Sequence, residues 1–207
     1  MQGHTPKLFV IVGSPASGKD ELVAAVNIIG TLHAEIVRKH TSRSWKPDDA
    51  DEMICAQIMD AETNQMKDNP EYDLANCDIK YNNYGSTYGI DTAKIWEKLR
   101  NGIFQVVVIS NKTALNKIKQ KFGKLAVFIY VYSTVTKEEW IKREKQKNRK
   151  NHDNYILPRA KNFDMAWNLY ENNFLLFDHV LIYAERQEDL FDQIFRLFKA
   201  YENRLII

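Results

Sequence analysis

The stretch KLFVIVGSPASGKDELVAAVNII, residues 7–29, decides the fold that we expect for this chain. Residues 7–12, KLFVIV, are an unbroken apolar run after Lys7, which is typical of a strand buried on both faces of a parallel sheet. A loop with two glycines follows, and residues 20–29 then have the composition of a helix. The order strand, glycine-containing loop, helix predicts a phosphate-binding loop inside an α/β protein.

Residues 13–19 of this stretch match the pattern G-x-x-x-x-G-K, with Asp20 at the position where Ser or Thr is usual. Glycines let successive backbone N–H groups converge on phosphate oxygens, the helix N-terminus adds partial positive charge, and the lysine reaches the β- and γ-phosphates. We therefore predict that the loop binds ATP. A carboxylate is a good hard-oxygen ligand, so Asp20 is the expected Mg²⁺ ligand. The residues assigned to the nucleotide are Gly13, Ser14, Ala16, Ser17, Gly18, Lys19 and Asp20.

The rest of the chain alternates strands and helices. Apolar runs predict strands at 35–41, 104–110, 125–132 and 179–183. Amphipathic or capped segments predict helices at 91–100, 113–122, 136–147, 159–173 and 188–202. This spacing indicates an α/β fold with a parallel sheet covered by helices on both faces. Residues 43–90 and the basic stretch 142–161 interrupt the alternation, and such interruptions usually lie above the carboxyl ends of the strands, where ligands bind.

Length and composition exclude several classes of protein. A chain of 207 residues with 44% hydrophobic residues suits one domain, or one domain with a small insertion. A net charge of +2 gives no indication of binding to nucleic acid or to a membrane surface. Two cysteines make a poor disulfide framework, and no apolar run approaches the roughly 18 residues of a membrane helix. We expect a cytoplasmic protein, monomeric or homodimeric, whose partners are small molecules rather than nucleic acid or membrane.

Three further motifs follow the phosphate loop in order. They are HTSRSWKPDD at 40–49, YNNYGSTYGI at 81–90 and the basic stretch at 142–161. With the loop, and with NKTALNKIKQKF at 111–122, this order resembles the guanylate kinase family of P-loop nucleoside monophosphate kinases, over about residues 7–201. The resemblance implies a P-loop core at 1–40 and 91–207 that includes a lid at about 143–160. It also implies an inserted acceptor-binding region at 41–90.

The resemblance also assigns residues to the acceptor and to the transferred group. Arg43 matches the first arginine that grips the acceptor phosphate, and Lys46 stands where a second arginine is usual. Tyr84 matches the tyrosine that donates to the same phosphate, with Ser86 following as in the pattern. Arg149 and Arg159 match the lid arginines that neutralise the transferring phosphoryl group. Lys19, Arg43, Arg149 and Arg159 are therefore the expected catalytic residues.

The positions that read guanine in the family depart from its pattern. The two acidic residues that contact the guanine edge fall on Ala75 and Asn111 here, and a serine near the base falls on Lys39. Lys39 and Asn111 therefore line the expected base pocket without a carboxylate. Asp73 or Asp78 takes over that role if the loop shifts by a few residues. A carboxylate that accepts from guanine is the strongest discriminator such a pocket has, so its loss puts the choice of acceptor in doubt.

The leading hypothesis is therefore ATP- and Mg²⁺-dependent phosphoryl transfer to a nucleoside monophosphate, with GMP or dGMP as first choice. One alternative keeps the chemistry and changes the acceptor to a sugar bisphosphate such as ribose 1,5-bisphosphate, which suits the missing guanine readers. A second alternative is a guanylate-kinase-like binding module without catalysis. Such modules usually have a degraded phosphate loop, whereas Gly13, Gly18 and Lys19 are intact here.

Overall fold

Five parallel strands form the central sheet of the protein. Our computed structural model describes residues 5–28, 33–45, 52–83, 85–146, 152–184 and 186–203, without the side chains of 152–155 and 158. The strand order is β10-β9-β1-β8-β2, with bounds Leu8–Gly13 (β1), Ala34–Ile36 (β2), Phe104–Val108 (β8), Ala126–Ser133 (β9) and His179–Tyr183 (β10). All four strand pairs are parallel, as the sequence predicts. Because β1 lies between β8 and β9, the loop that follows it opens at the middle of the sheet's carboxyl edge.

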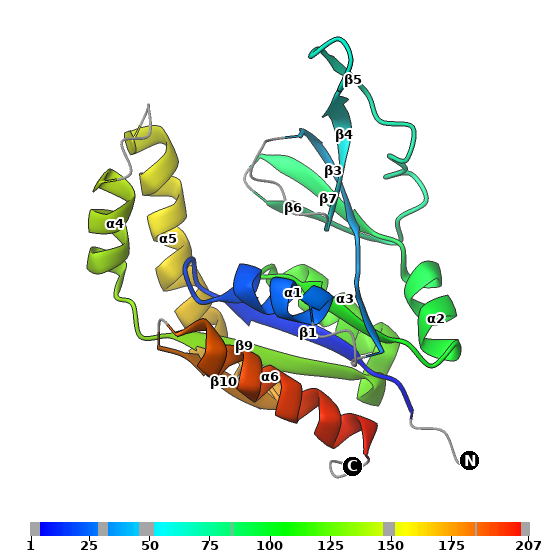
Figure 1. Cartoon of the computed structure of the whole chain (residues 1–207), viewed down its shortest axis with the longest axis vertical. Helices are drawn as coiled ribbons and strands as arrows, with labels where there is room; N and C mark the ends of the chain where they lie inside the picture. Colours follow the sequence, from blue (N-terminus) through cyan, green and yellow to red (C-terminus); the bar gives the residue numbers. More distant parts are fainter. Residues whose placement is uncertain are drawn as a thin grey trace.

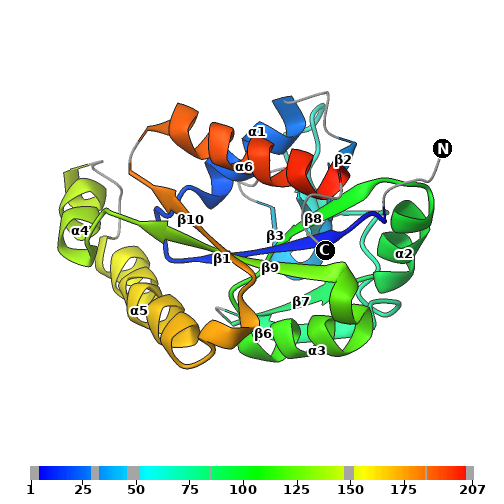
Figure 2. The same cartoon turned by 90° about the horizontal axis from the view of Figure 1, so that it is seen from below.

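Helices cover both faces of this sheet (Figure 2), which confirms the predicted α/β fold class. On one face lie α1 (Lys19–Ile28) and α6 (Gln187–Glu202), where Phe9 of β1 stacks on Phe198 with ring centroids 4.1 Å apart. On the other face lie α2 (Thr92–Arg100), α3 (Lys112–Phe122) and α5 (His152–Glu171). Leu8, Val10 and Val12 of β1 are fully buried on that second face. Each such side chain contributes about 1.5–3 kcal/mol through burial, which explains the unbroken apolar run of β1.

A second sheet rises above one end of the core (Figure 1). Its order is β5-β4-β3-β7-β6, and its strands span Lys39–Ser44 (β3), Met53–Met59 (β4), Met66–Asp68 (β5), Ile79–Asn83 (β6) and Ser86–Ile90 (β7). β3 pairs in parallel with β4 and antiparallel with β7. Tyr81 and Tyr88, which face each other across β6 and β7, are buried in the core cluster on the α3 side of the central sheet. One face of the second sheet therefore packs onto the core.

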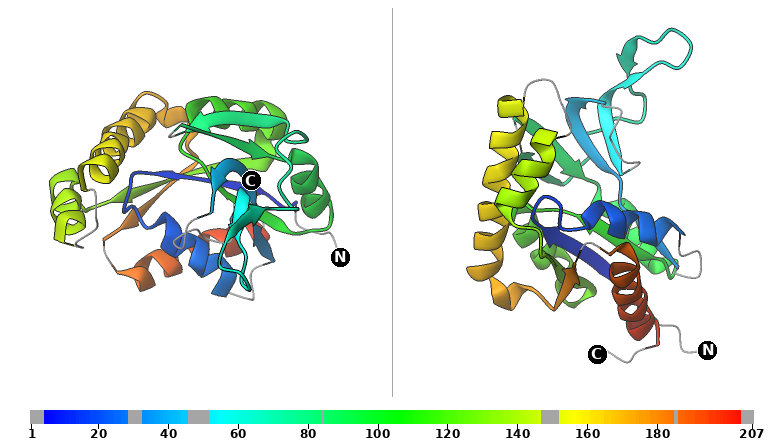
Figure 3. Two further views of the ribbon diagram at one scale, coloured as in Figure 1. Left: turned by 90° about the horizontal axis from the view of Figure 1, so that it is seen from above. Right: turned by 60° about the vertical axis from the view of Figure 1, so that its left-hand side comes forward.

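A helical hairpin stands opposite the second sheet, on the other side of the loop after β1 (Figures 1 and 3). It consists of α4 (Lys137–Gln146) and the first half of α5. The predicted capping box is present, because Thr136 Oγ1 accepts from the Glu139 N–H at 3.2 Å and Glu139 Oε2 accepts from the Thr136 N–H at 2.9 Å. Trp140 of α4 packs on Ile156 and Phe163 of α5, which joins the two helices.

The structure differs from the sequence expectations in two elements. The single strand expected at 35–41 is two strands, because β2 ends at Ile36 in the central sheet and β3 begins at Lys39 in the second sheet. The helix expected to begin at residue 159 begins at His152. A proline such as Pro158 usually marks a helix boundary. Here the residues on either side of it, Ile156 and Ala160, are buried in one cluster with Trp140, and this packing favours a continuous helix.

Two short 3₁₀ helices, Gly123–Leu125 (η1) and Phe174–Leu176 (η2), complete the described elements. They precede β9 and β10 respectively. Within the described ranges, no helix has both the length and the apolar character needed to cross a membrane.

Candidate active site

The loop between β1 and α1 has the backbone shape of an anion-binding cradle. Gly13 lies so close to its surroundings that a Cβ there would come within 2.4 Å of Ser17 Oγ and 2.7 Å of Val131 O. Ala16 and Gly18 have φ angles of 55° and 84°, in the left-handed region. This alternation of backbone conformation turns successive N–H groups toward one side, where an anion is bound. The loop conformation therefore needs both glycines of the predicted pattern. Ala16 also adopts a left-handed conformation, although it is not a glycine.

Two serine hydroxyls hold the loop from the flanking strands. Ser133, the last residue of β9, donates to Ala16 O at 3.1 Å and accepts from the Val135 N–H at 3.0 Å. Ser110, two residues after β8, donates to Gly13 O at 3.4 Å. Sequence reasoning missed both serines. The available signal was their position at or just beyond the carboxyl ends of the two strands that neighbour β1.

Lys19 folds back over the loop. Its ammonium donates to Ser14 O and, at 3.1 Å, to Ser17 Oγ, so it stays inside the cradle where phosphate oxygens bind. Burial lowers the pKa of Lys19 to about 8, although the nearby carboxylates of Asp20 and Glu21 raise it. Glu52 also raises this pKa, and Lys39 lowers it.

The residues of the loop fit a nucleotide polyphosphate with a bound Mg²⁺. A Cβ at Gly13 would meet Ser17 of the loop and Val131 of β9, and a Cβ at Gly18 would meet the side chains of Leu190 and Tyr183. Both positions therefore need glycine, and the loop backbone with the helix N-terminus behind it suits phosphate oxygens. Asp20 lies in the first turn of α1 with an exposed carboxylate. Over the described ranges no group of three His, Cys, Asp or Glu side chains gathers to hold a metal. Mg²⁺ at this loop would therefore take Asp20, phosphate oxygens and water as ligands, which is its usual preference.

The second sheet brings part of the predicted acceptor set to one end of β3 and β7. Arg43 is half-buried between the exposed residues Ser42 and Ser44. His40 pairs with Gly89 in the antiparallel register of these strands, and this register brings Arg43 toward the Ser86 end of β7. Ser42 Oγ accepts from the N–H of the residue after Ser86 at 3.0 Å, which ties the two strands at this end. The other two predicted phosphate contacts, Lys46 and Tyr84, lie outside the described residues.

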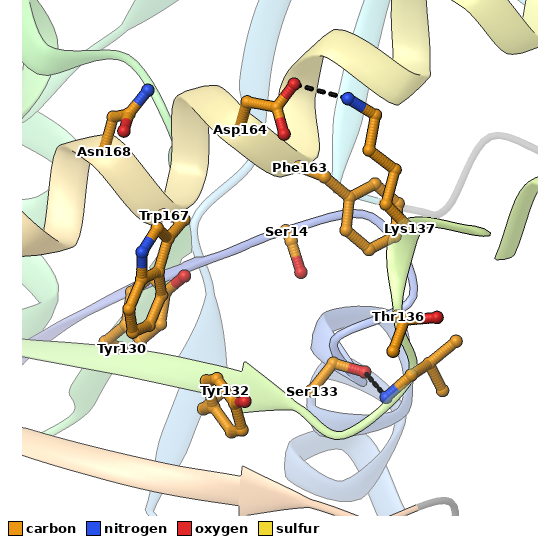
Figure 4. Close-up of a pocket in the computed structure, with 11 residues that line it drawn as sticks. Ser14, Tyr130, Tyr132, Ser133, Thr136, Lys137, Phe163, Asp164, Trp167 and Asn168 are labelled. Atoms are coloured by element: carbon orange, nitrogen blue, oxygen red, sulfur yellow. Dashed lines mark hydrogen bonds and ion pairs between the residues drawn. The ribbon is translucent and has the colours of Figure 1, made fainter. Parts of the chain in front are cut away.

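The α4–α5 hairpin carries the predicted lid residues. Arg149 lies outside the described residues, whereas Arg159 is exposed on α5, one helical turn before Phe163. A cavity of about 480 Å³ lies between the loop after β1, the end of β9, the start of α4 and α5 (Figure 4). Its lining combines a Lys137–Asp164 ion pair with four aromatic side chains. The full set of lining residues is Ser14, Tyr130, Tyr132, Ser133, Val135, Thr136, Lys137, Phe163, Asp164, Trp167 and Asn168. Sequence reasoning did not find this cavity, whose walls come from elements and loops that are far apart in the sequence.

The positions expected to read a guanine base have structural duties instead. Asn111 is the N-cap of α3, where its side chain accepts from the Ala114 N–H at 3.1 Å and donates to Asn82 O at 3.2 Å. Ala75 lies in an exposed loop. Asp73 accepts from Asn76 at 2.6 Å. The family positions, Ala75 and Asn111, thus carry no carboxylate, and Asp73 is hydrogen-bonded to Asn76.

Asp78, the other acid considered at that position, is also engaged. It accepts from the Thr92 N–H at 3.0 Å and from Thr92 Oγ1 at 2.6 Å, and it pairs with Lys121 of α3. Asp78 therefore fastens β6 to α2 and α3.

A buried ion pair lies where the second sheet meets the core. Lys39 Nζ donates to Val108 O, at the carboxyl end of β8, at 2.8 Å and lies 3.4 Å from Glu52 Oε1. The Lys39 and Glu52 side chains are only 4% and 12% exposed. Glu52 Oε2 and Thr41 Oγ1 are buried, and within the described part of the chain neither has a hydrogen-bond partner. Lys39 was a predicted substrate contact, but Glu52 was not found from the sequence.

Comparison with known proteins shows the fold. No family model and no curated protein matches the sequence. Among solved structures, a guanylate kinase from Anaplasma phagocytophilum is 14% identical over 98% of this chain and 89% of its own length, with a TM-score of 0.60. The YorR protein of Bacillus subtilis, solved in complex with phosphorylated GDP, is 12% identical over 95% of this chain and 98% of its own, with a TM-score of 0.44. From the first likeness, the chain has a guanylate kinase-like P-loop fold.

Proposed function

We propose that this protein is an ATP-dependent phosphotransferase that acts on a nucleoside monophosphate, with GMP or dGMP as the first choice. The observation that carries the proposal is the cradle after β1, where Lys19 donates to Ser17 Oγ inside a loop whose packing leaves no room for a Cβ at Gly13 or Gly18. The second sheet, with Arg43 at its outer end, stands across from the helical hairpin with the cradle between them (Figure 3). This arrangement suits two phosphorylated substrates that meet above the loop.

Phosphoryl transfer asks the protein to hold two reactants in line and to stabilise charge on the transferred group. Lys19 and the loop N–H groups bind the donor phosphates. Arg43 and Ser86, with Lys46 and Tyr84, bind the acceptor phosphate. Arg159 and Arg149 close over the reacting centre and exclude water, which otherwise competes as acceptor. Mg²⁺, bound with Asp20, supplies charge neutralisation on the donor phosphates. No general base is needed, because the attacking phosphate is already ionised.

One observation favours a second acceptor class, a sugar bisphosphate. The two family positions hold Ala75 and Asn111, which have no carboxylate, and Asp78, a possible substitute, fastens β6 to α2 and α3. An acceptor without a base needs no such carboxylate. The two candidates share Lys19, Asp20 and Arg43 and differ only in the contents of the acceptor site.

A panel of acceptors with Mg·ATP tests the proposal. GMP, dGMP, AMP, dTMP and ribose 1,5-bisphosphate are each incubated with the protein, and ADP formation is measured above the acceptor-free rate. We expect a nucleoside monophosphate to give the largest kcat/KM, and Lys19→Ala to abolish it while circular dichroism shows the fold retained. Lys124→Ala, at an exposed lysine in η1 far along the chain, is the matched control and leaves turnover unchanged. If no acceptor stimulates ADP formation and Mg·ATP does not bind at millimolar concentration, the protein is not a kinase.

A further inference from the structure

One buried hydroxyl joins the phosphate loop to the base of the helical hairpin. Ser133 Oγ donates to Ala16 O at 3.1 Å and accepts from the Val135 N–H at 3.0 Å, and Ser133 is only 9% exposed. Ala16 belongs to the loop after β1, whereas Val135 belongs to the segment that leads from β9 into α4. The hydroxyl therefore bonds, as donor and as acceptor, to the backbone of two segments that are far apart in the sequence.

The bond to Ala16 falls on a loop residue with an unfavourable backbone conformation. Its φ is 55°, and the left-handed region disfavours a residue with a Cβ by about 5- to 30-fold in its conformational equilibrium. Gly18, with a φ of 84°, adopts the same region freely because it has no Cβ. Such a conformation persists only when surrounding contacts hold it, and Ser133 supplies a contact of this kind at Ala16.

The bond to Val135 falls at the base of the hairpin (Figure 4). Val135 is buried in one cluster with Trp140 of α4 and Phe163 of α5, which is the apolar core of the hairpin. The capping box of α4 begins at Thr136, directly after Val135. Ser133 therefore fixes the backbone at the point where the chain leaves the central sheet and enters the hairpin.

We propose that Ser133 is a positioning residue that couples the phosphate loop to the α4–α5 hairpin. This inference rests on the proposed function and goes further, because it names the group through which the donor site and the lid are held in register. Toward the loop, the hydroxyl keeps Ala16 in the conformation that lets loop N–H groups converge on the donor phosphates. Toward the hairpin, it sets where α4 begins, so that the lid closes over the same phosphates and excludes water. Ser133 acts through the backbone of Ala16 and Val135 rather than on the reacting atoms.

The loop side is tested by the dissociation constant of Mg·AMP-PNP, a non-hydrolysable ATP analogue, in isothermal titration calorimetry. We expect Ser133→Ala to raise this constant about 10-fold. In an Ala16→Gly background the same change is expected to raise it by about twofold or less, because glycine adopts the left-handed region without an external contact. Ser110→Ala is the matched control. Its hydroxyl bonds to Gly13 O, so its effect is expected to be the same in both backgrounds.

The hairpin side is tested by comparing acceptor-free ATP hydrolysis with phosphoryl transfer to the acceptor that has the largest kcat/KM in the panel. In Ser133→Ala the Val135 N–H loses its acceptor, so we expect the share of ATP lost to water to rise severalfold. The Ala16→Gly background leaves this rise in place, because glycine at position 16 does nothing for the Val135 N–H. The two sides of the hydroxyl are thus measured separately in the same variants.

Each outcome decides between interpretations. A merely structural hydroxyl lowers the free energy of urea unfolding in Ser133→Ala and leaves the dissociation constant unchanged, which overturns the inference. A rise of equal size in both backgrounds shows that Ser133 does not act through Ala16 and also overturns it. An unchanged share of hydrolysis refutes the coupling to the hairpin. If the unmodified protein does not bind Mg·AMP-PNP, the proposed function itself fails, whereas binding that does not respond to Ser133→Ala refutes this inference alone.

Discussion

The lowered pKa of Lys19 makes nucleotide binding depend on pH in a way that can be calculated. Burial holds this pKa at about 8 in the free protein, against 10.5 for an ordinary lysine. Phosphate oxygens placed beside the ammonium favour its charged form, so binding of ATP returns the pKa to its ordinary value or above it. A neutral Lys19 must therefore take up a proton when ATP binds.

The size of this effect follows from the fraction of neutral lysine. With a pKa of about 8, about a tenth of the free molecules carry a neutral Lys19 at pH 7, half at pH 8 and nine-tenths at pH 9. Proton uptake on binding is therefore about 0.5 at pH 8 and about 0.9 at pH 9. By linkage the dissociation constant for ATP rises about tenfold from pH 7 to pH 9, which is about 1.4 kcal/mol. The terminal phosphate, with a pKa of about 6, is already ionised at pH 8 and does not contribute there.

Isothermal titration calorimetry in two buffers of different ionisation enthalpy measures this uptake directly. Lys19→Arg keeps a cation that does not titrate below pH 12, so this control is expected to bind ATP without proton uptake at pH 8. Uptake near zero at both pH 8 and pH 9 in the unmodified protein, with ATP bound, would show that Lys19 is not desolvated as the structure indicates. Uptake that persists in Lys19→Arg would assign the proton to another group.

Three further predictions concern the loop and the second sheet. Gly18→Ala places a Cβ 2.8 Å from an α6 side chain, in a residue whose φ is 84°. We expect this variant to lose ATP binding and, in urea unfolding, about 2 kcal/mol of stability. The control Gly102→Ala has a φ of 82° with open space around it, so it costs about 1 kcal/mol and leaves ATP binding intact. Thr41→Val removes a buried hydroxyl without a partner and raises the free energy of unfolding by about 1 kcal/mol; a decrease in chemical denaturation would show that the hydroxyl is bonded. Burial lowers the pKa of His40 and of His179, so as the pH falls the unfolded chain takes up protons on these residues before the folded chain does. The stability that they contribute is full above about pH 6.5 and decreases as the pH drops below that value. Thermal unfolding at pH 7.5 and 5.5 is expected to show a smaller decrease in melting temperature for His40→Asn than for the unmodified protein.

The phosphate half of the site was accessible from the sequence because its information is local. Seven consecutive residues set the curl of the loop, and the buried strand before it and the helix after it are visible as an apolar run and a helical segment. The left-handed backbone at Gly18 is one that glycine adopts freely, so the pattern foretells it. Ala16 was less visible, since nothing in an alanine signals a φ of 55°.

The acceptor half was less accessible because it depends on pairing between distant segments. Strand β4 is mostly half-exposed and β5 fully exposed, so their apolar periodicity is weak and residues 43–90 gave no clear strands. Whether Glu52 meets Lys39 is decided by the parallel pairing of β3 with β4, in which Lys39 lies opposite Met53. A lysine in a sequence is ordinarily read as exposed, and only its tertiary partners reveal that this one is buried.

The energetics of that pair indicate that it contributes little to the stability of the protein. Removing two charges from water costs several kcal/mol per ion, and attraction within the pair offsets this only when the geometry is good and the remaining lone pairs are satisfied. Here the Lys39–Glu52 separation is 3.4 Å and Glu52 Oε2 has no hydrogen-bond partner within the described structure, so the pair satisfies neither condition fully. Apolar residues of similar volume at such positions are often neutral or stabilising. We therefore expect that replacing both Lys39 and Glu52 by apolar residues of similar volume leaves the free energy of unfolding unchanged or raises it, whereas removing Glu52 alone lowers it because Lys39 is then buried without its partner.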